Sequence, residues 1–205
     1  MNFAKRLQRL ADSILDVTRI ESNSLKLNKE KINIHELICD VIEDHKAQIK
    51  SENHEKNLTY EPIVYGNTQD DIIIEADRER ITQVVSNLLS NAIKFTRDIK
   101  TEKDRAISTN VKKVKKDQKE DEYDVMVSVK DSGTGIDPEV LPKLFERFVS
   151  KSYSGTGLGL FISKSIVEAH GGTIWAENNE DGKGATFSFS LPMVSNKTDS
   201  LKIVH

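Results

Sequence analysis

The side chains best suited to chemistry lie in three segments that follow one another along the chain. The first is a helical segment that carries two amides and a lysine, at Asn87, Asn91 and Lys94. The second is Asp131-Ser132-Gly133-Thr134-Gly135-Ile136, in which a carboxylate directly precedes two closely spaced glycines. The third is a run of alternating glycines, Gly155-Thr156-Gly157-Leu158-Gly159. Taken singly, each pattern is typical of an exposed helix or a loop, so the inference rests on the ordered set.

Together, the three segments supply what a bound nucleotide needs. Asn87, Asn91 and Lys94 are spaced i, i+4 and i+7 and therefore share one helix face. Asn91 offers an amide oxygen to Mg²⁺, Asn87 can assist at metal or phosphate, and Lys94 offers positive charge to phosphate. Asp131 can accept a hydrogen bond from the exocyclic amine of adenine. The glycines of 155–159 let backbone N–H groups at a helix N-terminus approach phosphate. The set predicts a site for ATP and Mg²⁺.

Length and composition narrow the class of protein. With 205 residues, the chain is long enough for one sizeable domain and an appendage. The net charge of −3 favours no nucleic-acid partner. No apolar run reaches the ~20 residues of a membrane helix, so we expect no membrane contact by this segment. The single cysteine, Cys39, fits a reducing, cytoplasmic compartment and is interpreted as an inert packed thiol.

The N-terminal segment predicts a helix with an apolar seam. Its apolar residues are spaced 4, 3, 4 and 3 apart, the period of a helix that packs on another helix: Phe3, Leu7, Leu10, Ile14 and Val17. Asp16 lies off that seam and is expected to face water. A single helix of this length is marginal alone, so it must pack on the rest of the chain or on another copy, and both readings remain open.

The remaining pattern predicts an α/β (α+β) fold. We expect a two-layer sandwich of a mixed, mostly antiparallel sheet with helices on one face, plus the N-terminal helix. Asn33 and Asp77 are candidate helix N-caps. The expected elements are an extended stretch at 25–32, a helix after Asn33, strands at 58–64 and 72–75, a helix at 78–95, a hairpin at 106–130, a short helix from Asp137-Pro138, a helix at 158–170, and a hairpin of 173–177 and 185–191.

These residues carry a resemblance to a known family. Residues 33–192 resemble the catalytic ATP-binding domain of sensor histidine kinases, within the superfamily of gyrase, Hsp90 and MutL ATPases. The matching motifs are an asparagine box at Asn87–Phe95, a first glycine box at Asp131–Gly135, a phenylalanine box at Lys143–Phe148 and a second glycine box at Gly155–Leu160. The N-terminal helix is similar to the second helix of the family's dimerisation and phosphoacceptor hairpin.

The resemblance implies further site residues and a division of the chain. Phe95 would stack on the purine, Thr186 would approach adenine, and Lys151 in a short lid is a candidate phosphate contact. The whole nucleotide set is Asn87, Asn91, Lys94, Phe95, Asp131, Gly133, Gly135, Ile136, Lys151, Gly155, Thr156, Gly157, Leu158, Gly159 and Thr186. The implied division is a truncated hairpin helix at 1–28, the ATP-binding domain at 29–192 and a flexible tail at 193–205.

The resemblance also implies a reaction. None of the five histidines stands in the family's phosphoacceptor motif, so the γ-phosphoryl group of ATP would pass to a histidine outside this segment. His45 is interpreted as an exposed polar residue and His170 as a helix C-terminal residue favoured by the helix dipole. Asn87 stands where hydrolysing relatives carry a general-base glutamate, which favours transfer over hydrolysis.

The implied partners are a response-regulator receiver domain and a histidine-bearing helix of the same or a sister chain, in a homodimeric full-length protein. The segment would be cytoplasmic or the cytoplasmic part of a membrane-bound sensor. Two alternatives stay open: an interaction scaffold that retains the ATP-binding fold without kinase activity, and a serine kinase or ATPase of the same superfamily.

Overall fold

A computed structural model describes residues 3–22, 24–51, 59–60, 64–65, 72–97, 106–116, 122–149, 156–180 and 182–193. The helices are α1 (Phe3–Glu21), α2 (Ile34–Ser51), α3 (Arg78–Arg97) and α4 (Gly159–Ala169). The strands are β1 (Glu30–Asn33), β2 (Thr59–Tyr60), β3 (Val64–Tyr65), β4 (Ile73–Ala76), β5 (Ala106–Lys115), β6 (Tyr123–Asp131), β7 (Thr173–Asn178) and β8 (Ala185–Pro192). No helix in these ranges is long and apolar enough to cross a membrane.

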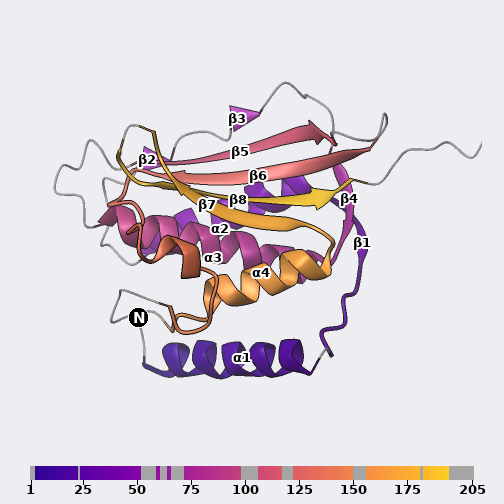
Figure 1. Cartoon of the computed structure of the whole chain (residues 1–205), viewed down its shortest axis with the longest axis horizontal. Helices are drawn as coiled ribbons and strands as arrows, with labels where there is room; N and C mark the ends of the chain where they lie inside the picture. The colour runs from indigo at the N-terminus through magenta and orange to yellow at the C-terminus, as the bar shows by residue number, and fades with distance from the viewer. Residues whose placement is uncertain are drawn as a thin grey trace, which may run out of the picture.

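The elements form two layers and a separate helix. The main sheet has the order β2-β5-β6-β8-β7, with β3 also paired to β5. Its long strands run antiparallel, whereas the short β2 and β3 run parallel to β5. Helices α2, α3 and α4 cover one face of the sheet, and α1 lies beyond them, on the side away from the sheet (Figure 1). The predicted fold class is confirmed.

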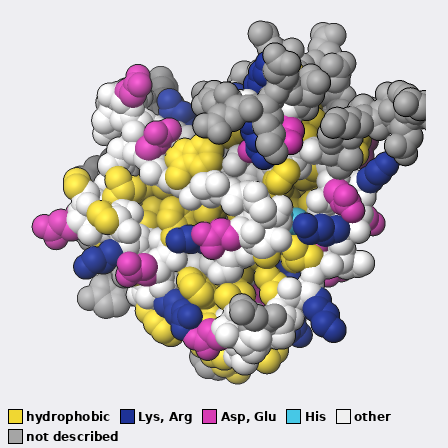
Figure 2. All heavy atoms as spheres, turned by 45° about the vertical axis from the view of Figure 1, so that its right-hand side comes forward, with side chains coloured by type: hydrophobic (Ala, Val, Ile, Leu, Met, Phe, Trp, Pro, Cys, Tyr) yellow, Lys and Arg dark blue, Asp and Glu magenta, His cyan; other side chains and the backbone are white. Residues whose placement is uncertain are grey.

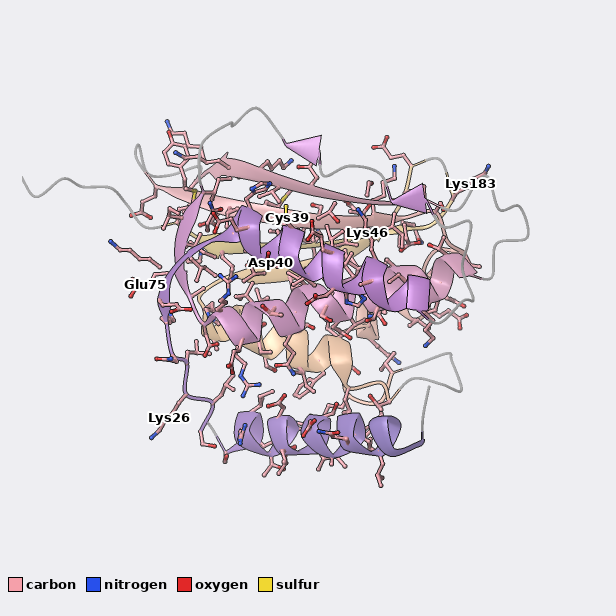
Figure 3. All side chains as sticks on the ribbon, turned by 180° about the vertical axis from the view of Figure 1, so that it is seen from behind. Lys26, Cys39, Asp40, Lys46, Glu75 and Lys183 are labelled. Atoms are coloured by element: carbon pink, nitrogen blue, oxygen red, sulfur yellow. The ribbon has the colours of Figure 1, made fainter. Side chains whose placement is uncertain are left out.

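The core lies between the sheet and the helices. Phe187, Phe189 and Leu191 alternate along β8 and are all buried, as the period of two predicts. Figure 3 shows Cys39 on the side of α2 nearer the main sheet, where its half-buried thiol lies 3.5 Å from His35 Nε2. On the face shown in Figure 2, side chains of both charges are interspersed, in keeping with the small net charge.

Helix α3 begins and packs as its sequence predicts. The backbone N–H of Arg80 donates to Asp77 Oδ1 at 3.1 Å, so Asp77 is the N-cap. One face is buried against the core through Ile81, Val84, Val85, Leu88 and Ala92. The opposite row of Asn87, Asn91 and Lys94 is only half-buried. One face therefore anchors the helix, while the other presents polar groups.

Helix α1 packs differently from the prediction. The first part of the seam is exposed, with Leu7 at 58% and Ile14 at 52% of their full area, whereas Val17 and Ile20 pack on the core. Asp16, expected to face water, is only 6% exposed. The reason is that Asp16 lies four residues before Ile20 and shares its face, which is the face that meets the domain.

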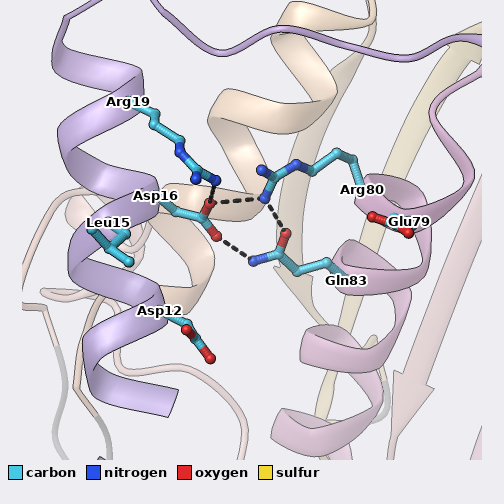
Figure 4. A pocket seen from close by; sticks show the side chains of 7 residues that line it. All are labelled: Asp12, Leu15, Asp16, Arg19, Glu79, Arg80 and Gln83. Carbon is cyan, nitrogen blue, oxygen red and sulfur yellow. Dashed lines mark hydrogen bonds and ion pairs between the residues drawn. The ribbon is translucent and has the colours of Figure 1, made fainter. Parts of the chain in front are cut away.

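Asp16 joins α1 to α3. Its carboxylate accepts hydrogen bonds from Arg80 Nη1 and Gln83 Nε2, each at 2.8 Å, and Arg80 also donates to Gln83 Oε1 at 3.0 Å (Figure 4). Arg19 on α1 adds a longer contact of 3.9 Å. The cluster borders a cavity of about 370 Å³ between the two helices. A buried carboxylate, a partly buried guanidinium and the Gln83 amide thus join α1 to α3.

The segment after Asp137 also departs from the prediction. Only a single 3₁₀ turn forms, at Leu141–Lys143, where a longer helix was expected. Pro142 explains the difference, because it has no N–H for a helical bond and biases Leu141 away from the α conformation. Phe148, at the end of this segment, has a φ of 62° and is 73% exposed.

Two histidines are placed differently from their interpretation. His170 is buried at the end of α4; its Nδ1–H donates to the Ile166 carbonyl at 2.8 Å, and its Nε2 accepts from the Asp77 N–H at 2.9 Å. Because Nε2 accepts a hydrogen bond it carries no proton, so the ring is neutral and is not a cation held by the helix dipole. Burial, the main cause, lowers the pKa of His170 in the same sense. His45 is half-buried, with its Nε2 2.9 Å from Ser86 Oγ, and thereby links α2 to α3.

Candidate nucleotide site

The polar row of α3 meets the beginning of α4. Asn87 Nδ2 donates to Ser163 Oγ at 3.0 Å, and Ser163 is almost fully buried. A Cβ added to Gly159 would overlap Asn87 Oδ1, so only glycine allows this approach. Asn87 therefore ties α3 to the first turns of α4, and Asn91 lies one turn further along the same row.

The second glycine cluster is fixed by backbone contacts where the structure describes it. Gly157 has a φ of 68°, and a Cβ there would lie 2.6 Å from the carbonyl carbon of Phe148. The N–H of Phe148 donates to the Gly157 carbonyl at 2.9 Å, and Thr156 Oγ1 accepts from the Leu158 N–H at 3.3 Å. The N-terminus of α4 is thus presented beside Asn87. Lys151 and Gly155 lie outside the described residues, so their predicted roles remain predictions.

Asp131 ends β6 as a buried, oriented carboxylate. Its Oδ1 accepts from the N–H groups of Gly133 at 2.8 Å and Ala185 at 3.4 Å. Burial raises the pKa of the Asp131 carboxyl, while these two hydrogen bonds act in the opposite direction. Both bonds from described residues go to Oδ1, so Oδ2 is the oxygen that can accept from the amine of a ligand.

The C-terminal end of α3 lies against the first glycine loop. A Cβ on Gly133 would be 2.7 Å from Asp131 Oδ1 and 2.8 Å from the Phe95 carbonyl oxygen. The close packing of the first glycine loop against the carboxylate and the end of α3 therefore requires glycine at position 133. Phe95 is half-buried at this end, and Lys94 Nζ lies 5.2 Å from the centre of its ring. Gly133 therefore lies against both Asp131 and Phe95, and Lys94 lies beside the Phe95 ring; their roles at a nucleotide remain predictions.

Thr186 is not brought into this group. It pairs with Lys130 across β6 and β8, and strand alternation places it on the opposite face of the sheet from Asp131. There its hydroxyl donates to Asn179 Oδ1 at 2.7 Å, and it borders a groove of about 270 Å³ with Ser128 and Lys130. The residue of β8 beside Asp131 is Ala185. The period of two along β8 could have revealed this placement from the sequence.

Several residues with a role at the site carried no sequence signal of their own. Ser163 looks like an ordinary helix residue, yet it holds Asn87. Asn178 and Asn179 look like part of a turn, yet Asn178 binds Ile136 of the glycine loop and Asn179 binds the Asp131 carbonyl. Their partners are distant in sequence, so local pattern could not identify these contacts.

Comparison with known proteins agrees with this geometry. Residues 76–195 match the model of the family described as histidine kinase-, DNA gyrase B- and HSP90-like ATPases. The chain belongs to this family. The predicted resemblance is thereby confirmed.

Among the members of this family, the relatives and solved structures similar to the chain include histidine kinases. The chain is 32% identical to the sensor histidine kinase WalK of Bacillus subtilis over 97% of its own length and 30% of the relative's. It is 34% identical to the sensor protein KdpD of Clostridium acetobutylicum, over 91% of its own length and 19% of that relative's. The catalytic domain of histidine kinase ThkA superposes with a TM-score of 0.65 at 34% identity, covering 81% of this chain and 96% of that one. Full-length ShkA, solved in complex with AMPPNP, gives a TM-score of 0.70 at 28% identity, over 92% of this chain and 36% of that one. The chain therefore spans less than a third of the two curated relatives.

Proposed function

We propose that this chain is the ATP-binding catalytic part of a two-component sensor histidine kinase. It would transfer the γ-phosphoryl group of ATP to a histidine outside this segment. The observation that carries the proposal is the buried Asp131 carboxylate, oriented by two backbone N–H groups at the point where Gly133 packs against it and against the end of α3. A base with an exocyclic amine fits that acceptor.

The residues at hand fit a nucleotide with its metal ion. Asp131 Oδ2 would accept from the adenine amine, and Phe95 would stack on the ring. Asn91 would supply an amide oxygen to Mg²⁺, while Lys94 and the N-terminus of α4 would face the phosphates. When bound, Mg²⁺ neutralises phosphate charge and orients the phosphate chain. The chain's own contribution is then position and fixed charge, which phosphoryl transfer chiefly requires.

The contacts of Asn87 favour transfer to an imidazole over hydrolysis. A carboxamide has no basic site for the proton of an attacking water, and the Nδ2 of Asn87 is bonded to Ser163. Among the described histidines, both ring nitrogens of His170 are hydrogen-bonded inside the protein, while His35 contacts Cys39 and His45 contacts Ser86. Since none of the five histidines stands in the family's phosphoacceptor motif, the proposal assigns the acceptor to another segment, of this protein or of a sister chain.

The partners follow from that reaction. A phosphohistidine would pass its phosphoryl group to the receiver domain of a response regulator. The exposed apolar residues Leu7, Leu10 and Ile14 of α1 suit a neighbouring helix of a dimerising hairpin in the full-length protein. We place this part of the protein in the cytoplasm, where ATP is available.

Calorimetry with ADP tests the nucleotide site first. We expect magnesium-dependent binding, and a loss of about 30- to 100-fold in affinity for Asp131→Asn, which presents an amide where the amine needs an acceptor. Asp137→Asn, in the same loop, is the matched control and should bind like the unmodified chain. Absence of ADP binding by the unmodified chain would refute the proposal.

A transfer assay tests the reaction. Incubated alone with γ-labelled ATP, the chain should not become labelled. When a separate histidine-bearing hairpin is supplied, that hairpin should acquire an acid-labile label. Asn91→Ala should abolish the label, whereas the exposed Asp12→Ala should retain it. Steady ATP hydrolysis without transfer to the hairpin would favour an ATPase instead.

A further inference from the structure

Asn178 is the last residue of β7 and Asn179 follows it directly, and their side chains make separate sets of contacts. The side chain of the first, Asn178, makes hydrogen bonds to both backbone groups of one residue in the first glycine loop, Ile136. Its Oδ1 accepts from the Ile136 N–H at 2.6 Å, and its Nδ2 donates to the Ile136 carbonyl at 2.8 Å. A backbone N–H can only donate and a carbonyl can only accept, so these partners fix the orientation of the amide.

The second, Asn179, holds the backbone of Asp131. Its Nδ2 donates to the carbonyls of Asp131 at 2.9 Å and Lys183 at 2.6 Å. Both partners can only accept, so Oδ1 points the other way, where it accepts from the Thr186 hydroxyl at 2.7 Å. Thr186 thus fixes Asn179 from the outer face of the sheet.

Gly135 and Gly184 lie where the β7–β8 hairpin packs closely against Asp131 and the first glycine loop. Gly135 has a φ of 75°, and a Cβ there would lie 2.9 Å from Asn178 Oδ1. Gly184 has a φ of 77°, and a Cβ there would overlap the Asp131 carbonyl oxygen. Because no side chain separates the hairpin from Asp131 and its loop, hydrogen bonds set their spacing. Asn178 and Asn179 supply three of these hydrogen bonds, and two further bonds of Asn179, to Lys183 and Thr186, lie within the hairpin.

We propose that Asn178 and Asn179 are positioning residues of the nucleotide site. Asn178 fixes the glycine loop that would line the site for the base, and Asn179 fixes the backbone that carries the Asp131 carboxylate. The inference rests on the proposed nucleotide function and assigns neither asparagine a direct contact with the base. Since both act on the base end of the site, their loss should weaken adenosine and ADP alike and leave the magnesium dependence unchanged.

The test compares Asn178→Ala with Glu177→Ala, an exposed neighbour on the same strand. For Asn178→Ala we expect a 5- to 10-fold loss of affinity for both adenosine and ADP, as two solvent-accessible hydrogen bonds allow. Hydrogen exchange at the Ile136 amide should quicken, and the melting temperature should stay close to that of Glu177→Ala. Asn179→Ala should weaken adenosine to a similar degree.

Asn178→Asp separates positioning from a general loss of structure. The ionised carboxylate still accepts from the Ile136 N–H but repels the Ile136 carbonyl, whereas the protonated acid can donate to it. Adenosine affinity of this variant, relative to the unmodified chain at the same pH, should therefore be low at pH 7.5 and should recover only as the pH approaches the ordinary aspartate pKa of about 3.9.

The outcomes are distinct. If the unmodified chain binds neither adenosine nor ADP, the proposed function fails and the positioning role fails with it. If it binds both and Asn178→Ala binds them equally well, the positioning role alone is overturned. Equal losses in Asn178→Ala and Glu177→Ala, or a pH-independent Asn178→Asp, would likewise overturn it.

Discussion

Removal of the Asp16 carboxylate should release α1 from the domain. Asp16→Ala takes away the acceptor shared by Arg80 and Gln83 and leaves the Arg80 guanidinium without its close counter-charge. Breaking a fully buried ion pair from one side costs about 3–5 kcal/mol. Here the Arg80 side chain is 20% exposed and borders a cavity, so water can replace part of what is lost. We therefore expect a cost of about 2 kcal/mol.

Hydrogen exchange of α1 measures this cost directly. At about 1.4 kcal/mol per factor of ten, amides in the second half of α1 should lose about 30-fold in protection. Asp12→Ala is the matched control, because it removes the same charge from an exposed position on the same helix and the same cavity. Asp16→Asn keeps an acceptor without the charge and should fall between the two.

A double-mutant cycle gives the refuting result. Asp16→Ala and Arg80→Ala should be non-additive by at least about 1 kcal/mol, because each removes the same interaction. Additive effects, or equal exchange in Asp16→Ala and Asp12→Ala, would show that the Asp16 contacts do not hold α1, and that Val17, Ile20 and the Glu21–Arg147 ion pair suffice.

Three further outcomes follow from the geometry. Gly157→Ala combines a φ of 68° with a Cβ 2.6 Å from Phe148, so it should lower ADP affinity at least tenfold while far-ultraviolet circular dichroism is unchanged. Gly159→Ala would force Asn87 away from α4 and should reduce transfer to a supplied histidine hairpin, an effect that Ser163→Ala should share in weaker form. The pKa of His170 is lowered in the folded state, so the unfolded chain binds the proton first, and the free energy of unfolding should fall as the pH drops below about 6.5. Urea titrations from pH 7.5 to 5 should show this decline, by at most about 1.4 kcal/mol per pH unit, and His170→Asn should remove it.

Local pattern was sufficient where one segment determines its own structure. Asp77 caps α3, the apolar stripe buries one face, and Asn87, Asn91 and Lys94 follow on the other by helical period alone. The glycines of the first loop were recognisable because close backbone approach leaves few alternatives to glycine. The arrangement of Asn87, Asn91 and Lys94 on α3 and the glycines of the first loop was therefore predictable from their spacing.

Long-range contacts limited the rest. The burial of Asp16 depends on Arg80 and Gln83, which lie 64 and 67 residues further along the chain. The hydrogen bond that His170 Nε2 accepts comes from the N–H of Asp77, 93 residues away. Thr186 is a different case: its motif was matched by position, while the alternation of its strand, which was readable, places it on the other face of the sheet from Asp131.

One polar stripe of α3 contacts both α1 and the candidate nucleotide site. It consists of Arg80, Gln83, Asn87, Asn91 and Lys94, which are spaced 3, 4, 4 and 3 apart. The stripe binds Asp16 of α1 near its beginning and Ser163 of α4 in its middle, and it ends beside the first glycine loop. Eleven residues separate Arg80 from Asn91, about 16 Å along a helix whose other face is buried in the core. On the proposed function, a movement of the whole of α3 that follows a change at Asp16 would also move Asn91 and Lys94. Where the two sites are coupled in this way, linkage requires nucleotide to change the docking of α1 by the same free energy.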